Sequence, residues 1–269
     1  MGGLTVLGAL MQALPGEDFV YLGDTARLPY GTKSPATVSA YACQAARLLV
    51  QRGVKALVVA CNTASAFALQ DLARLFSDIP VFGVVEPGAD AAVKAARTVH
   101  SSHIVVLATE STIAGGAYQQ ALLSRAPNLT VYGRSCPLWV TLAEMGTRPE
   151  TLVQQVLSND LRGWLGASDV QGHTVLLGCT HFPVFSSAIH ALFAQHEIPL
   201  QLVDSATTTA QVVTAELTRQ SALRSQGHTG GLQCLATDDV SRFSKVGERF
   251  LGKTLELEQV ELVDLGGLG

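Results

Sequence analysis

The sequence has no run of 18 or more consecutive apolar residues among its 269 positions. A helix that crosses a bilayer needs about 20 such residues, so we expect no membrane span. Charged residues are also few, at 15%, and Lys and Arg (18) do not outnumber Asp and Glu (22). This composition argues against a disordered chain, a coiled coil and a nucleic-acid-binding protein, which usually has a basic excess.

Cysteines are few and widely spaced, and none belongs to a CxxC motif. The five are Cys43, Cys61, Cys136, Cys179 and Cys234. An odd, scattered set disfavours both a disulfide framework and a zinc ribbon. The apolar N-terminal segment has no Lys or Arg before Arg27 and no small-residue cleavage site after it, which argues against a signal peptide. We therefore expect a protein of the reducing cytoplasm.

Short apolar runs alternate with longer amphipathic segments along most of the chain. This order is typical of an α/β fold, in which helices cover both faces of a parallel sheet. The predicted strands are residues 19–22, 56–60, 81–85, 104–107, 175–178, 200–203 and 232–236. The predicted helices are residues 35–51, 63–76, 87–99, 111–124, 150–165, 183–196 and 206–220. A chain of this length has room for two cores.

Two segments of the sequence resemble each other. Residues 56–67 and 174–185 each contain an apolar strand, a cysteine (Cys61 or Cys179), two polar residues and the start of a helix. In both, an acidic residue follows the cysteine by 25 positions. The repeat indicates two related, pseudo-symmetric halves. Because ligands of open α/β sheets bind beyond the carboxyl ends of the strands, we expect the two cysteines to line one cleft from opposite sides.

Two opposed cysteines indicate a particular chemistry. A thiol at a helix N-terminus feels the positive end of the helix dipole, which should lower its pKa. One such site would indicate nucleophilic catalysis. Two mirrored sites indicate that one thiolate removes a proton from a carbon while the other thiol delivers a proton to the opposite face, which inverts the stereocentre without a cofactor. The polar residues Asn62, Thr63 and Thr180 would hold an anionic substrate at the helix N-termini.

Each candidate also has a structural interpretation. A lone cysteine at the end of a buried strand is most often a small core residue, and we assign Cys43, Cys136 and Cys234 to that class. His181 could be a zinc ligand, but a metal site needs three or four protein ligands and the sequence shows no second cluster. The isolated carboxylates Asp24, Glu86 and Glu144 are more often helix caps or solvated charges than catalytic groups. We expect no metal.

The cysteine motifs resemble those of bacterial glutamate racemases, in the cofactor-independent aspartate/glutamate racemase superfamily. The motifs are Ala60-Cys-Asn-Thr-Ala-Ser65 and Leu177-Gly-Cys-Thr-His-Phe-Pro183, and their cysteines are 118 residues apart. Further matching segments are residues 2–6, 21–27, 29–31, 83–88, 108–112, 144–146 and 202–205. We predict one domain from residues 1–92 with 207–269, a second from residues 93–206, and an active site between two doubly wound sheets.

The resemblance implies roles for individual residues. Cys61 and Cys179 match the two acid/base cysteines, on the D-glutamate and L-glutamate sides respectively. His181 matches a histidine that assists the second cysteine, and Glu144 matches a nearby acidic residue. Substrate contacts are implied for Tyr30, Gly31, Asn62, Thr63, Thr112 and Thr180. The resemblance further implies glutamate as substrate, no cofactor, no nucleic-acid or membrane partner, a homodimer, and a cytoplasmic step that supplies D-glutamate for peptidoglycan.

One feature of the family is missing. The family begins with a strand followed by Asp-Ser-Gly-x-Gly-Gly, whose Asp assists the first cysteine, whereas this sequence starts at Met1-Gly2-Gly3. The first strand of a doubly wound sheet is usually central, so its loss would leave a gap of about two strand spacings, roughly 10 Å. We expect a longer natural chain, because the downstream motifs are intact. The alternative is a truncated protein whose function is impaired.

Two other functions stay open. One is racemisation of aspartate or another amino acid by a member of the same superfamily. The other is a truncated, catalytically silent protein that binds glutamate in its cleft.

Overall fold

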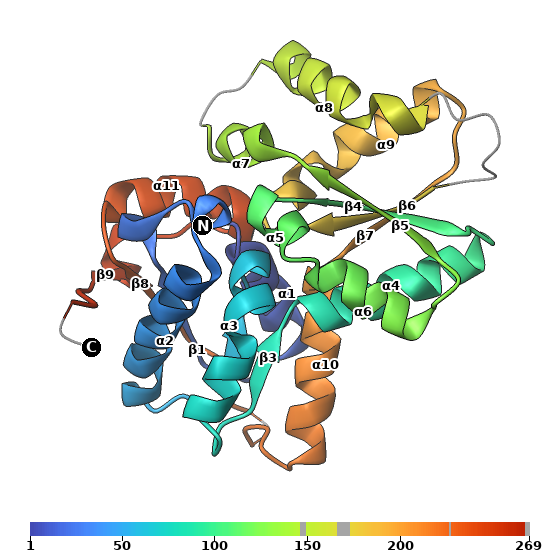
Figure 1. The fold of residues 1–269 in the computed structure, drawn as a ribbon. Helices are drawn as coiled ribbons and strands as arrows, with labels where there is room; N and C mark the ends of the chain where they lie inside the picture. The colour runs from blue at the N-terminus through green and yellow to red at the C-terminus, as the bar shows by residue number, and fades with distance from the viewer. Residues whose placement is uncertain (146–148, 166–172, 226, 267–269) are drawn as a thin grey trace.

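The computed structural model describes residues 1–145, 149–165, 173–225 and 227–266. It has the predicted α/β architecture, and every strand pair in the described ranges is parallel. The strands form three sheets, in the orders β5-β4-β6-β7, β1-β8-β9 and β2-β3. Figure 1 shows the four-stranded sheet on one side of the molecule and the two smaller sheets on the other. Of the helices in these ranges, none has the length and apolar character of a membrane span.

The strands and helices have the following bounds. The strands are β1 (Phe19–Gly23), β2 (Leu57–Val59), β3 (Val81–Gly83), β4 (His103–Ala108), β5 (Thr130–Ser135), β6 (His173–Gly178), β7 (Leu200–Asp204), β8 (Leu232–Ala236) and β9 (Val260–Leu262). The α-helices are α1 (Leu4–Ala13), α2 (Pro35–Gln51), α3 (Asn62–Leu75), α4 (Val85–Thr98), α5 (Glu110–Ala114), α6 (Ala117–Arg125), α7 (Pro137–Glu144), α8 (Glu150–Leu165), α9 (Ser186–Gln195), α10 (Ser205–Arg219) and α11 (Val240–Leu251). Four 3-10 helices are η1 (Thr25–Arg27), η2 (Tyr30–Thr32), η3 (Phe182–Phe185) and η4 (Leu257–Gln259).

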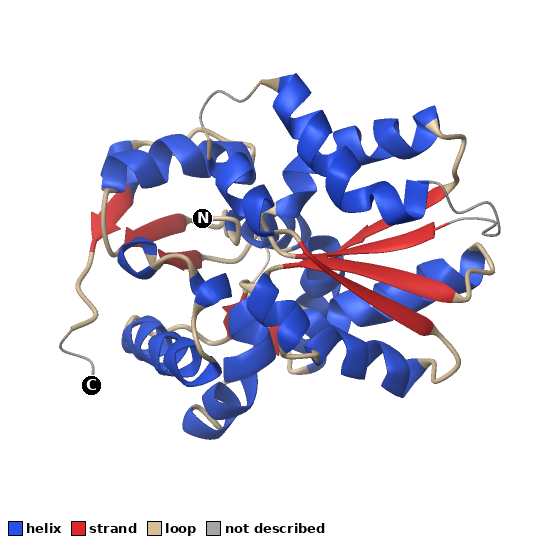
Figure 2. Cartoon of the chain, turned by 45° about the horizontal axis from the view of Figure 1, so that its top comes forward, coloured by secondary structure: helices blue, strands red, loops and turns tan. Residues whose placement is uncertain are grey.

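The second domain is built on the four-stranded sheet, whose two central strands are buried at every position. Alternate side chains of β4 face opposite sides. Val105 and Leu107 pack in the cluster with α7, α8 and α9, whereas Ile104 and Val106 pack in the cluster with α4 and α6. Figure 2 shows helices on both faces of this sheet. The long apolar runs at β4 and β6 therefore exist because both faces are covered.

The first domain contains the two smaller sheets, not the single sheet that we predicted. Among the described strands, β1 pairs with β8 and β2 pairs with β3, so β1 and β2 each present an edge to the space between them. A cavity of about 1220 Å³ occupies this space and is lined by both strands and by apolar residues of α1, including Leu7 and Leu10. The sheet of this domain is therefore interrupted by a gap of the kind that we predicted.

Several elements differ from the predicted ones for identifiable reasons. The strand β5 escaped prediction because it is a partly exposed edge strand, in which Tyr132 is 48% exposed. The helix α1 lies between α10 and α11 and buries apolar residues toward both, so it lacks a polar face. The predicted helix over residues 111–124 is two helices, because the chain turns at Gly116 with φ 66°. Sequence analysis also missed α7, α11 and β9.

The two domains meet at α4 and α10. The helix α4 packs against β6 and β7 of the four-stranded sheet, and α10 packs against both α1 and α4. The predicted boundaries, after residues 92 and 206, fall within or beside these two helices. The division of the chain at those residues stays a prediction.

A buried histidine pair lies at the amino ends of β4 and β6. His103 Nε2 is 2.8 Å from His173 Nδ1, and both residues are buried. Burial lowers the pKa of both rings, and the charge on His103 lowers that of His173 further. The folded protein therefore favours the neutral rings, whereas the unfolded chain binds protons near the ordinary histidine pKa of about 6.5.

This pair predicts a loss of stability in mild acid. Its contribution to the free energy of unfolding should be complete above about pH 6.5 and fall as the pH drops through the lowered pKa values. Urea unfolding of the wild type and of His103→Gln between about pH 8 and pH 5 measures the effect. Glutamine does not titrate, so the variant should lose part of the wild-type slope. Equal slopes would contradict the prediction.

Candidate active site

The structure brings the two repeated cysteines to one cavity. Cys61 follows β2 and is the N-cap residue of α3, and Cys179 follows β6 shortly before the 3-10 helix η3. Both line the cavity of about 1220 Å³. The remaining three cysteines lie elsewhere: Cys136 and Cys234 are fully buried in the core, and Cys43 is half-buried on α2.

Cys179 lies at the end of a chain of polar contacts. Its Sγ is 3.7 Å from His181 Nδ1. His181 Nε2 donates to Glu144 Oε1 at 2.9 Å, which leaves the Nδ1 lone pair directed at the thiol. The backbone nitrogen of Gly2 also lies 3.2 Å from Nε2, but a protonated Nε2 cannot accept from it. The three side chains have the geometry of a thiol, a base and a carboxylate that orients the base.

Burial controls the protonation of this chain. Burial raises the pKa of Cys179 to about 12, although a hydrogen bond from the backbone of His181 acts to lower it. Burial also lowers the pKa of His181, although the hydrogen bond to Glu144 acts in the opposite direction. For Glu144, burial acts to raise the pKa, but the hydrogen bond from His181, with the nearby positive charges of which Arg242 is one, holds the pKa below its usual value. The pair is therefore a neutral imidazole and a carboxylate.

Cys61 has different neighbours. Burial raises its pKa, and the backbone N–H groups of Ala64 and Thr63 and the Thr63 hydroxyl only partly offset the rise. These groups belong to the first turn of α3, so the expected stabilisation of the thiolate by the helix N-terminus is present. The prediction that the dipole would lower the thiol pKa is nevertheless wrong, because desolvation dominates. In the described residues, no imidazole or carboxylate hydrogen-bonds to Cys61.

Asn62, a predicted substrate residue, is joined to a buried partner. Asn62 Nδ2 donates to the hydroxyl of Tyr118 at 2.6 Å. Asn62 Oδ1 is buried without a hydrogen-bond partner in the described residues, so its capacity to accept a hydrogen bond is unused. Burial raises the pKa of Tyr118 well above its usual value, which keeps its hydroxyl protonated.

The hydroxyl groups of Thr63, Thr109 and Thr112 form a cluster. The Thr63 and Thr112 oxygens are 3.0 Å apart, and Thr109 lies 3.1 Å from Thr63 and 3.0 Å from Thr112. Thr63 and Thr109 line the cavity, whereas Thr112 does not. Thr112 is buried and supports the other two hydroxyls through its hydrogen bonds to them.

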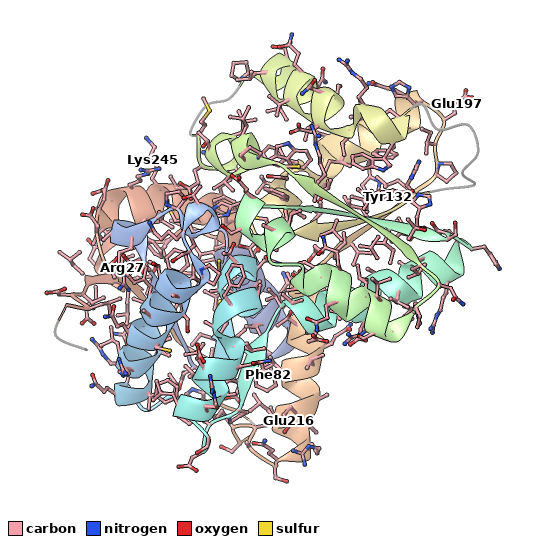
Figure 3. All side chains as sticks on the ribbon, in the orientation of Figure 1. Arg27, Phe82, Tyr132, Glu197, Glu216 and Lys245 are labelled. Carbon is pink, nitrogen blue, oxygen red and sulfur yellow. The ribbon has the colours of Figure 1, made fainter. Side chains whose placement is uncertain are left out.

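Tyr30 and Gly31 belong to η2, on the first-domain side of the cavity. The Tyr30 hydroxyl donates to Asp24, and Arg27 Nε donates to both oxygens of the same carboxylate at 2.9 and 2.8 Å. A Cβ atom on Gly31 would lie only 2.7 Å from Thr109 Cβ, so only glycine lets this loop approach the second domain so closely. Figure 3 shows Arg27 on the first-domain side.

Other predicted positions are placed as follows. Thr180 is buried, lines the cavity and accepts on its carbonyl oxygen from Thr5 Oγ1 at 3.2 Å. Glu86 is an exposed ion-pair partner of Arg125 at 2.7 Å, as expected for a solvated charge. Gly146 of the 144–146 motif lies outside the described residues. No group of three or more His, Cys, Asp or Glu in the described ranges is arranged to hold a metal ion.

Sequence reasoning missed four side chains near this site. They are Asp24, Thr109, Tyr118 and Arg242. Asp24 and Thr109 lie inside matching segments and could have been singled out there. Tyr118 and Arg242 carry no local signal, because they reach their partners Asn62 and Glu144 over 56 and 98 residues of sequence.

The arrangement can transfer protons on opposite faces of one carbon atom of a bound molecule. A carbon held between the two thiols could lose a proton to one sulfur and receive a proton from the other. His181 can exchange a proton with Cys179, and the hydroxyl, amide and backbone groups of α3 can bind an anion. The site is therefore suited to proton transfer at a carbon of an anionic substrate.

Comparison with known proteins assigns the chain to a family. The model of the Asp/Glu/Hydantoin racemase family matches residues 5–213. A glutamate racemase from Geobacter metallireducens is 43% identical over 263 residues, 97% of this chain and 94% of the relative. The crystal structure of a Francisella tularensis glutamate racemase in complex with D-glutamate has a TM-score of 0.84 at 32% identity, and covers 99% of this chain and 95% of that chain. An isoform from Bacillus anthracis has a TM-score of 0.87 at 33% identity, over 98% of this chain and 94% of that chain. On this evidence, the chain belongs to the Asp/Glu/Hydantoin racemase family.

Proposed function

We propose that this protein is a glutamate racemase, which interconverts L- and D-glutamate without a cofactor. The observation that carries the proposal is the placement of Cys61 and Cys179, at repeated positions of two domains, around one cavity. The glutamate racemase relatives, one of them bound to D-glutamate, support glutamate as the substrate.

The proposed reaction transfers protons through both thiols. With D-glutamate bound, the Cys61 thiolate removes the Cα proton and the Cys179 thiol delivers its own proton to the opposite face. With L-glutamate bound, the two cysteines exchange roles. The Cα proton is far less acidic than a thiol, so the site must stabilise a carbanion-like transition state with fixed hydrogen-bond donors. Asn62, Thr63 and Thr180, with Tyr30 and Gly31, bind the substrate, and Thr112 supports Thr63.

Other parts of the proposal come from the family resemblance. D-glutamate enters peptidoglycan, so the enzyme would work in the cytoplasm, in cell-wall biogenesis and in the maintenance of cell shape. We further propose a homodimer, and domains formed by residues 1–92 with 207–269 and by residues 93–206.

Replacement of either cysteine tests the two-base mechanism. Cys61→Ser and Cys179→Ser should each abolish racemisation, a loss of at least about 100-fold, because serine is a much weaker acid than cysteine. The assay is loss of optical activity together with exchange of the Cα proton in D₂O, from enantiopure L- and D-glutamate. Aspartate assayed in parallel distinguishes the alternative substrate.

The matched control for this assay is Cys43→Ser, since Cys43 lies on α2 and does not line the cavity. It should keep wild-type activity. In the two site variants, any remaining exchange should be limited to one enantiomer, D-glutamate for Cys179→Ser and L-glutamate for Cys61→Ser. Full racemisation by either site variant would refute the mechanism.

The raised thiol pKa values predict an alkaline rise in activity. Burial keeps both cysteines protonated at neutral pH in the free protein, whereas the reaction needs one thiolate. We therefore expect kcat/KM to increase about tenfold per pH unit between about pH 7 and pH 9. Initial rates from both enantiomers measure this profile, with circular dichroism as a control for folding. A plateau that begins near pH 7 would show that a thiolate is already present in the free protein.

A further inference from the structure

The helix α11 connects the first domain to the second beside Cys179. Arg242 Nη2 on α11 donates to Glu144 Oε2, at the end of α7, at 3.1 Å. Glu144 Oε1 accepts from His181 Nε2. One carboxylate therefore bridges a guanidinium of one domain and the imidazole that faces the Cys179 thiol.

Two further residues of α11 contact the end of α7 and the ring of His181. Arg249 donates to the carbonyl oxygens of Ala143, at 3.3 Å, and Met145, which both belong to the C-terminal end of α7. The Phe250 ring stands edge-on to the His181 ring, with centroids 5.2 Å apart and an interplanar angle of 83°. The end of α7 and the ring of His181 are thus both fixed by one helix of the other domain.

The titratable and charged groups that face Glu144 and His181 come from three further elements. Arg242 lies on α11, Cys179 follows β6, and the α-amino group of Met1 lies ahead of α1. Of these, Arg242 alone makes a direct ion pair with Glu144 in the part of the chain that the structure describes, other than the contact with His181 itself. The Glu144 side chain is only 11% exposed, whereas that of Arg242 is 58% exposed.

A carboxylate with a single imidazole partner can rotate or take the Nε2 proton. A second donor on its other oxygen fixes its plane and stabilises its negative charge. The Nε2 proton then stays on His181, and Nδ1 remains free to exchange a proton with the thiol. We propose that Arg242 is a positioning residue for the Cys179 side of the reaction, which holds Glu144 so that His181 keeps Nδ1 directed at Cys179.

This proposal rests on the proposed racemase function for its kinetic consequences but not for its electrostatic ones. The electrostatic test is the titration of the His181 ring by NMR in the full chain, with the signal identified by its loss in His181→Gln. Arg242→Gln removes a cation beside Glu144, so the pKa of His181 should rise. Lys245→Gln removes the same charge from the exposed side of α11, where Lys245 points away from the molecule (Figure 3), and should leave the titration unchanged.

The kinetic test must distinguish proton transfer at Cys179 from proton transfer at Cys61. The equilibrium constant between enantiomers is one, so kcat/KM is necessarily equal in both directions, and only isotope effects identify the slowed step. Arg242→Gln should lower kcat/KM about fivefold to tenfold. It should also raise the primary deuterium isotope effect on L-[2-²H]glutamate, whose deuteron Cys179 removes, more than that on D-[2-²H]glutamate. Arg242→Lys, which keeps the charge, should recover most of the activity.

The outcomes distinguish this inference from the function on which it rests. Absence of racemisation by the wild type would refute the function, while the His181 titration would still decide the role of Arg242. Identical His181 titrations for Arg242→Gln and Lys245→Gln would overturn the inference. Equal changes of the two isotope effects from their wild-type values in Arg242→Gln would overturn it as well, and unfolding by urea would show whether any loss comes only from reduced stability.

Discussion

Burial of two thiols in one cavity is the constraint on which the rest of this structure depends. A dry site strengthens the interactions that stabilise a carbanion-like transition state, but the same desolvation disfavours the thiolate that must form. Burial raises the pKa of both Cys61 and Cys179. Each thiolate therefore needs local support, and the fold supplies it in two different ways.

The fold places both cysteines by the same rule. Each follows a parallel strand, so each lies at the carboxyl end of a sheet, where polar backbone groups of the following segment are exposed to a ligand. The second domain forms this edge on a continuous sheet whose central strands are covered on both faces. In the first domain the sheet is divided, and the edges of β1 and β2 form walls of the cavity itself. The edges of β1 and β2 thus form the apolar walls of the cavity, and the carboxyl ends of the strands form its polar end.

Local patterns predicted much of the fold. The strands that precede Cys61 and Cys179, the helix α3 and the α/β class all follow from apolar runs and from the repeat. The helices α7 and α11 were missed, although Asp239 and Gly252 are local signals at the two ends of α11. The contact between Glu144 and Arg242 could not be predicted, because it joins residues 98 positions apart. The direction of the thiol pKa shifts was also missed. A helix N-terminus can be recognised in a sequence, whereas the depth of burial that outweighs it depends on tertiary packing.

The repeat also shows where the two domains diverge in chemistry. When the cysteines are aligned, Thr63 corresponds to His181, and both contact the neighbouring thiol. A hydroxyl can only share a hydrogen bond with its cysteine, whereas an imidazole backed by Glu144 can take the proton away. The two thiols are therefore unequal bases, although the two enantiomers have equal free energies. Because kcat/KM is equal in both directions, a kinetic difference between the two thiols can be expressed only as kcat and KM values that differ between L- and D-glutamate by the same factor.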